Sequence, residues 1–148
     1  MLRDYILREI EKMAAIITAA RQKIFGGTES TAITLEAQIQ QAKGMLRDEV
    51  HFDLDAFLDL DVEASKEYIC SFEGFNVENI GLLAECLSEM GFSNKCETPE
   101  KYLEKALQLY ELCNAKSKTF SFEREANIGA IKSALPGNFE NKEKADRN

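Results

Sequence analysis

The sequence predicts an all-α protein with about six to seven helices. Apolar residues recur at spacings of three and four along almost the whole chain, which is the period of one helix face. Helix stop and start signals, such as Gly26-Gly27 and Thr98-Pro99-Glu100, separate the periodic segments. No segment requires a β-strand. The 148 residues suit one domain, which we expect to span residues 1–136.

The first periodic segment predicts a long helix over residues 2–25, ended by Gly26-Gly27. Its apolar residues exceed a single stripe, because three of them lie off the main line: Leu7, Ala14 and Ile16. A helix in a small domain packs mainly on one side, so these three residues suggest the seam of a homodimer. A central helix covered on two sides by its own chain is the alternative.

The next three segments are shorter. Thr28 or Ser30 can cap a second helix, whose inner face holds Leu35, Ile39, Ala42 and Leu46. Leu54, Phe57 and Leu58 lie on one side of a short helical turn. Asp61 is the expected N-cap of a helix that ends near Gly74, with three residues inward: Val62, Ile69 and Phe72.

Three further helices complete the prediction. Asn76 can cap a helix that stops at Gly91, and Thr98-Pro99-Glu100 combines a capping hydroxyl, a proline at the first position and an acid. A last helix over about 120–135 has an apolar set of Phe122, Ala126, Ile128, Ile131 and Leu135. We expect residues 137–148 to form a disordered polar tail.

The formal net charge of −8 argues against nucleic-acid binding, which needs clustered Lys and Arg. The excess lies in residues 51–98, where two bases and eleven acids give −9, whereas residues 1–28 carry +2. This acidic middle segment could attract a basic partner or simply keep the surface solvated.

The sequence offers no catalytic apparatus. His51 is the single histidine, so two-imidazole mechanisms and common zinc hydrolase sites are excluded. The carboxylates of residues 53–63 fail the calcium-loop pattern, and we interpret them as caps of two short helices. The four cysteines have no CxxC spacing. We therefore predict a non-enzymatic protein with no cofactor and no metal.

Neither a signal peptide nor a membrane span is recognisable, because charged residues interrupt the apolar stretch at the N-terminus. We expect a cytoplasmic protein with reduced cysteines. A membrane-surface role for the first helix is disfavoured, since that helix lacks a dense basic face and Trp.

Residues 77–115 resemble a tetratricopeptide helical hairpin with an enlarged turn. The matching positions follow the spacing of such repeats: Leu83, Ala84, Leu87 and Gly91 in the first helix, and Ala106, Tyr110 and Cys113 in the second. Gly91 and Ala106 are fifteen residues apart, whereas a standard repeat leaves five, and no second copy is convincing.

Four longer segments extend this likeness over residues 4–113: DYILREIEKMAAII, FDLDAFLDLDVEAS, NVENIGLLAECLSEMGF and YLEKALQLYEL. Together they resemble a bacterial family of small tetratricopeptide-like proteins of unknown function. The resemblance implies antiparallel hairpins stacked in a right-handed superhelix and a bacterial cytoplasmic origin. It implies no catalytic residue.

The sequence thus favours a helical module that binds a protein or peptide, or a second copy of itself. The alternative is a small-molecule sensor with an apolar pocket. Five aromatic residues could line such a pocket: Phe72, Phe75, Phe92, Phe120 and Phe122. Packing between helix layers is the other interpretation of these residues.

Overall fold

The computed structural model describes residues 2–26, 34–93 and 96–136, and within these ranges it contains seven helices and no β-strand. The helices are α1 (Leu2–Phe25), α2 (Leu35–Val50), α3 (Leu54–Leu58), α4 (Val62–Cys70), α5 (Val77–Phe92), α6 (Pro99–Lys116) and α7 (Phe122–Ala134). The all-α prediction and the expected helix number are confirmed. The expected tail, residues 137–148, lies outside the described residues.

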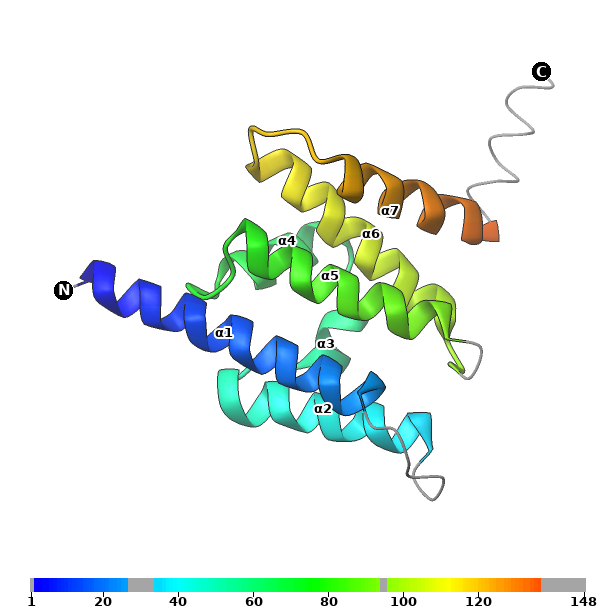
Figure 1. Cartoon of the computed structure of the whole chain (residues 1–148), viewed down its shortest axis with the longest axis horizontal. Helices are drawn as coiled ribbons and strands as arrows, with labels where there is room; N and C mark the ends of the chain where they lie inside the picture. Colours follow the sequence, from blue (N-terminus) through cyan, green and yellow to red (C-terminus); the bar gives the residue numbers. More distant parts are fainter. Residues whose placement is uncertain (1, 27–33, 94–95, 137–148) are drawn as a thin grey trace.

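The long helices form two antiparallel pairs that pack side by side (Figure 1). α1 packs against α2, α5 packs against α6, and the pairs meet where α1 contacts α5. The short helices α3 and α4 connect the pairs, and α3 contacts both α2 and α6. α7 packs on α6 and ends the described part of the chain.

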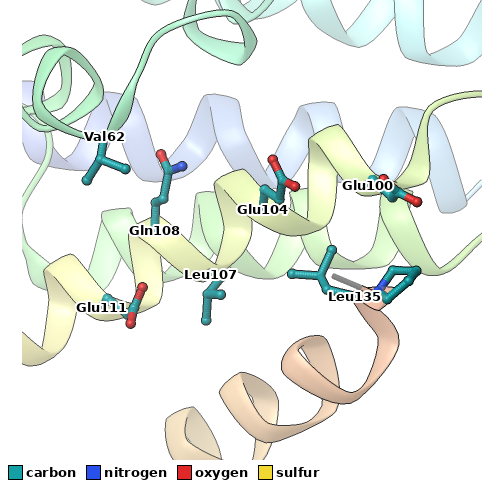
Figure 2. A pocket seen from close by; sticks show the side chains of 8 residues that line it. Val62, Glu100, Glu104, Leu107, Gln108, Glu111 and Leu135 are labelled. Atoms are coloured by element: carbon teal, nitrogen blue, oxygen red, sulfur yellow. The ribbon is translucent and has the colours of Figure 1, made fainter. Parts of the chain in front are cut away.

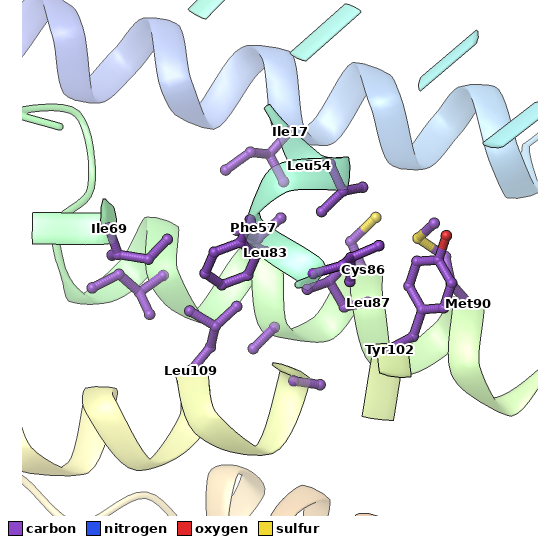
Figure 3. Packing of buried hydrophobic residues seen from close by; sticks show 14 of the residues in the cluster. Ile17, Leu54, Phe57, Ile69, Leu83, Cys86, Leu87, Met90, Tyr102 and Leu109 are labelled. Carbon is purple, nitrogen blue, oxygen red and sulfur yellow. The ribbon is translucent and has the colours of Figure 1, made fainter. Parts of the chain in front are cut away.

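The apolar core lies between these helices, and Figure 3 shows its central part. Ile17 of α1, Phe57 of α3, and Leu83 and Leu87 of α5 are each at most 1% exposed. Complete burial of one such side chain is worth about 1.5–3 kcal/mol, so their packing is a main source of stability.

A second packing centre is an aromatic cluster whose residues lie along the chain between the end of α2 and the start of α5. The Phe52 ring lies 5.3 to 5.6 Å, between centroids, from the rings of its four neighbours: Phe57, Tyr68, Phe72 and Phe75. Offset and edge-to-face pairs of this kind each add about 0.5–1.5 kcal/mol beyond their burial. The Tyr68 hydroxyl also accepts a hydrogen bond from the Asp53 amide at 2.9 Å.

The turn before α5 is held directly against α1. A Cβ on Gly74 would lie 2.8 Å from the Glu9 carbonyl oxygen, so only glycine fits this close approach. The buried Asn79 amide donates to the carbonyl oxygens of Ile10 at 2.8 Å and Gly74 at 2.7 Å. One polar side chain therefore joins the two helix pairs.

Most helix boundaries agree with the prediction. Asp61 and Asn76 cap α4 and α5 as expected, because their side-chain oxygens accept hydrogen bonds from the amides of Ala64 and Asn79. Thr98 precedes α6, but its hydroxyl makes no capping bond. Gly91 does not end α5: the helix continues to Phe92.

Three details of α2 and α4 differ from the prediction. Thr34 caps α2, since it directly precedes the first apolar residue of the stripe. The two expected caps, Thr28 and Ser30, lie outside the described residues. α4 ends at Cys70 rather than near Gly74, and Val62, at its open end, is 47% exposed.

The buried face of α7 holds fewer residues than the sequence predicts. Ile128, Ile131 and Leu135 are buried, whereas Phe122 is 84% exposed and Ala126 is exposed too. Ala126 lies two positions before Ile128, which turns it about 200° around the helix, away from α6.

Candidate protein-binding groove

The residues that carry the tetratricopeptide resemblance form the contact between α5 and α6. All of them are buried: Leu83, Ala84, Leu87, Gly91, Ala106, Tyr110 and Cys113. Apart from the glycine, each side chain is at most 4% exposed. A Cβ on Gly91 would lie 2.7 Å from the Leu103 side chain, so this glycine lets the two helices approach closely. These positions hold the fold together and are not accessible to a ligand.

The two polar side chains in this set are held by neighbouring elements. The Tyr110 hydroxyl accepts a hydrogen bond from the Asn127 side chain of α7 at 3.2 Å, and the Cys113 thiol donates to the Val77 carbonyl at 3.5 Å. Burial, with a smaller effect of Glu85, raises the pKa of Tyr110 to about 12. Both groups therefore stay protonated at neutral pH and serve packing.

The three residues expected at a dimer seam do not share one face. Ile16 packs against the core, Ala14 is partly buried, and Leu7 is 49% exposed. Leu7 and Ala14 are seven residues apart and so lie on nearly the same side of α1, whereas Ile16 lies on another. The homodimer through α1 stays a prediction.

The aspartates between α2 and α4 each interact with a different partner. Asp53 and Asp61 cap α3 and α4. Asp55 forms an ion pair with Lys43 at 2.8 Å, and Asp59 forms one with Lys101 at 2.8 Å. The hydrogen bond from Lys101 lowers the pKa of Asp59. In the described ranges, no three His, Cys, Asp or Glu side chains converge as metal ligands do.

The five aromatic residues considered for an apolar pocket are spread over the molecule. Phe72 and Phe75 belong to the aromatic cluster at the start of α5. Phe92, at the other end of α5, is 48% exposed and lies about 24 Å away along a helix of this length. Phe120 and Phe122 are exposed at the start of α7. These residues do not line a common pocket.

Lys105 is a buried cation that the sequence analysis missed. Only 3% of it is exposed, and its ammonium donates to the Leu60 carbonyl, the Ser65 hydroxyl and the Gln108 side chain. Burial lowers its pKa. Its three donors are all used inside the fold, so Lys105 links α6 to the α3–α4 connection rather than binding a substrate.

A groove of about 430 Å³ runs along the outer side of α6 (Figure 2). One wall is Val62 at the start of α4, and the other is Leu135 and Pro136 after α7. The floor is α6, which contributes Leu107 and Gln108 together with three carboxylates: Glu100, Glu104 and Glu111.

The groove is strongly acidic. Glu100, Glu104 and Glu111 are exposed, and none of them forms an ion pair within the described part of the chain, nor does any basic side chain line the groove. Like charges four residues apart, as at Glu100 and Glu104, destabilise a helix by about 0.2–0.5 kcal/mol. A cationic ligand would remove this repulsion, while its apolar atoms cover the exposed wall residues Val62 and Pro136.

A second hollow, of about 320 Å³, lies where α5, α6 and α7 meet. It too contains carboxylates, but Arg124 lines it and Glu85 is held by Arg21 at 3.0 Å. Its charge is thus partly compensated within the fold. The α6 groove is the stronger candidate for a functional site.

The position of this groove differs from the sequence expectation. The acidic excess was located in residues 51–98, yet the unpaired carboxylates belong to α6, in a part of the chain with a net charge of +1. A signal was present in the sequence: Glu100, Glu104 and Glu111 are spaced by four and seven and share one helix face.

Comparison with known proteins finds no relative of this chain. No protein family model matches the chain, and neither the curated proteins nor the solved structures contain a match. Among the described helices, none combines the length and apolar character needed to cross a membrane.

Proposed function

We propose that this protein is a non-enzymatic interaction module, which binds a basic segment of a protein or peptide partner in the α6 groove. The observation that carries this proposal is the set of three unpaired glutamates beside the exposed apolar wall residues Val62 and Pro136. Helix-in-groove recognition uses this combination, in which apolar anchors give affinity and charges set orientation.

The arrangement of the helices supports the module class. Two antiparallel pairs stack through α1 and α5, and we propose that they are neighbouring hairpins of a tetratricopeptide-like superhelix with α3 and α4 inserted between them. Such stacked hairpins present surfaces for peptides without catalytic groups. The protonated Tyr110 hydroxyl and the capping roles of Asp53 and Asp61 also favour a non-enzymatic protein.

We further propose that the protein works in the bacterial cytoplasm. All four cysteines are free thiols, as is usual where glutathione and thioredoxin keep thiols reduced. The resemblance of residues 4–113 to a bacterial family supports the same assignment.

The binding experiment uses a synthetic amphipathic helical peptide with Lys and Leu spaced by three and four residues. We expect isothermal titration calorimetry to show binding that weakens as the salt concentration rises. A second peptide with Glu in place of Lys should not bind.

The groove variant for this experiment is Glu104→Gln with Glu111→Gln. Loss of two charge pairs should weaken binding of the lysine peptide by about tenfold. The matched control, Glu49→Gln with Glu67→Gln, removes the same charge from exposed positions outside the groove and should bind like the original protein. Equal affinity for both double variants would remove the groove from the proposal.

A further inference from the structure

The turn between α6 and α7 presents a surface whose chemistry is opposite to that of the groove. This surface, the basic aromatic tip, consists of Lys116, Lys118, Phe120 and Phe122. Phe120 is 68% exposed and Phe122 is 84% exposed, and their rings pack edge to face with centroids 4.8 Å apart. Such an exposed aromatic pair leaves a large apolar area in contact with water and is typical of a contact surface.

The backbone of the tip is held in one arrangement. The Ser117 hydroxyl accepts a hydrogen bond from the Thr119 amide at 3.2 Å, and the two hydroxyls lie 2.9 Å apart. Ser121 caps α7 by accepting from the Arg124 amide at 3.1 Å. A surface ordered in advance loses little conformational entropy when it binds.

The tip and the groove differ in the sign of their charge, since Lys116, Lys118 and Arg124 outnumber the two carboxylates at the start of α7, Glu123 and Glu125. Lys116 and Lys118 are exposed and form no ion pair among the described residues, as is true of Glu100, Glu104 and Glu111. The two phenyl rings supply apolar area for Val62 and Pro136, the exposed apolar residues of the groove walls. Two lysines and two rings are thus complementary to three glutamates between apolar walls.

The tip adjoins the Glu111 end of its own groove, since Lys116 follows five residues later in α6, but it cannot fill the groove as far as Leu135. It lies before α7, whereas the Leu135 wall of the groove follows α7, a helix about 20 Å long that packs along α6 (Figure 1). The occupant must come from another molecule. An anionic membrane is a poorer partner for the tip, because the chain carries a net charge of −8.

We propose that a second copy of this chain inserts its basic aromatic tip into the α6 groove. This inference rests on the proposed function, because it names the partner of the same groove. The contact is heterologous: each bound pair leaves one tip and one groove free. The expected product is therefore an open series of oligomers rather than a closed dimer.

Sedimentation velocity over protein concentrations from about 1 µM to about 1 mM tests the proposal. The weight-average mass should rise continuously from 16.7 kDa, and this rise should be lost at high salt. A tip variant, Phe120→Ser with Phe122→Ser, and a groove variant, Glu104→Lys with Glu111→Lys, should each remain monomeric. All four substituted residues are exposed, and thermal unfolding of each variant checks that it folds.

Mixing the two variants provides the decisive measurement. Each retains one intact half of the contact, so the mixture should form a one-to-one complex of about twice the chain mass and grow no further. A monomeric original protein at every concentration would overturn the self-association. Association that is abolished only by Leu7→Asp in α1 would also overturn it. The same holds if the monomer sediments with anionic vesicles through the tip.

The lysine peptide separates this inference from the proposed function. If the protein stays monomeric but the groove variant loses peptide binding, the groove binds a different basic partner and only the self-association is wrong. If the peptide also fails to bind, both proposals are wrong.

Discussion

The Lys105 ammonium lies 5.1 Å from the centroid of the Phe57 ring, so a cation of α6 contacts an aromatic side chain of α3. The same ammonium donates hydrogen bonds to the Leu60 carbonyl and the Ser65 hydroxyl. α3 buries Leu54, Phe57 and Leu58 and α4 buries Ser65 and Ile69, and Lys105 adds a polar contact from α6 to both short helices. Lys105 therefore acts as an internal link between the insertion and the helix hairpin.

Replacing Lys105 with Met should lower the free energy of unfolding by about 2–4 kcal/mol. The thioether fills similar space but removes the donor to the Ser65 hydroxyl and leaves the Leu60 carbonyl with only the 3.5 Å hydrogen bond from Ser65. Lys101→Met removes a lysine from the same helix, and its pair with Asp59 is exposed and screened by solvent, so its effect should be much smaller than that of Lys105→Met. Urea unfolding followed by circular dichroism measures both, and equal effects would contradict the internal link.

Two glycines of α5 should respond in opposite ways to alanine. At Gly91 the new methyl group would meet the Leu103 side chain at 2.7 Å and the Pro99 carbonyl at 3.1 Å, so we expect a loss of about 1–3 kcal/mol. At Gly81 nothing lies within 4 Å, so Gly81→Ala should gain about 0.5–1 kcal/mol through helix propensity. Thermal unfolding of the two variants gives the comparison, and a stabilising Gly91→Ala would show that α5 and α6 can separate without cost.

His51 ends α2 in the left-handed region, with φ at 62° and ψ at 25°. It is the sole non-glycine residue with a positive φ in the described part of the chain. His51→Gly should raise the unfolding free energy by about 0.5–1 kcal/mol, because glycine adopts this conformation without steric cost. His51→Val, with a β-branched side chain, should lower it by about 1–2 kcal/mol. If the melting temperatures follow the reverse order, the turn after α2 does not constrain its backbone.

Local signals explain why so much of the helix layout follows from the sequence. The caps at Asp61 and Asn76 depend on residues three positions away, and the stripe of α6 depends only on the helix period. Lys105 shows the opposite case, since its partners Leu60 and Ser65 are about forty residues distant. The glutamates of α6 share a face by sequence, but their groove exists only because Val62 and Leu135 meet them in space.

Phe122 illustrates the same limit on prediction. Its place in an apolar series suggested burial, but α6 covers only the Ile128 and Ile131 side of α7. Whether a helix face is covered depends on the neighbour, which periodicity alone does not identify.

Alkaline pH should destabilise the protein through Cys86. Burial raises the pKa of this thiol from 9.0 to about 12, and Glu89 adds to the effect. Below pH 9 both the folded and the unfolded chain keep the proton, so the full stability is present. Above pH 9 the unfolded chain releases it while the folded chain holds it until about pH 12, so stability falls across this interval. The full pKa difference corresponds to about 4 kcal/mol.

Comparison of the original protein with Cys86→Ala isolates this contribution. Urea unfolding at intervals from about pH 8 to about pH 11 should show a difference in stability between the two proteins that shrinks by about 2–3 kcal/mol, because alanine has no proton to lose. Cys70→Ala is the matched control: Cys70 is exposed, so its replacement should leave the pH profile of the original protein unchanged. A Cys86→Ala profile parallel to that of the original protein would mean that the thiol is hydrated in the folded state, and that α5 packs less tightly against α1 than the structure indicates.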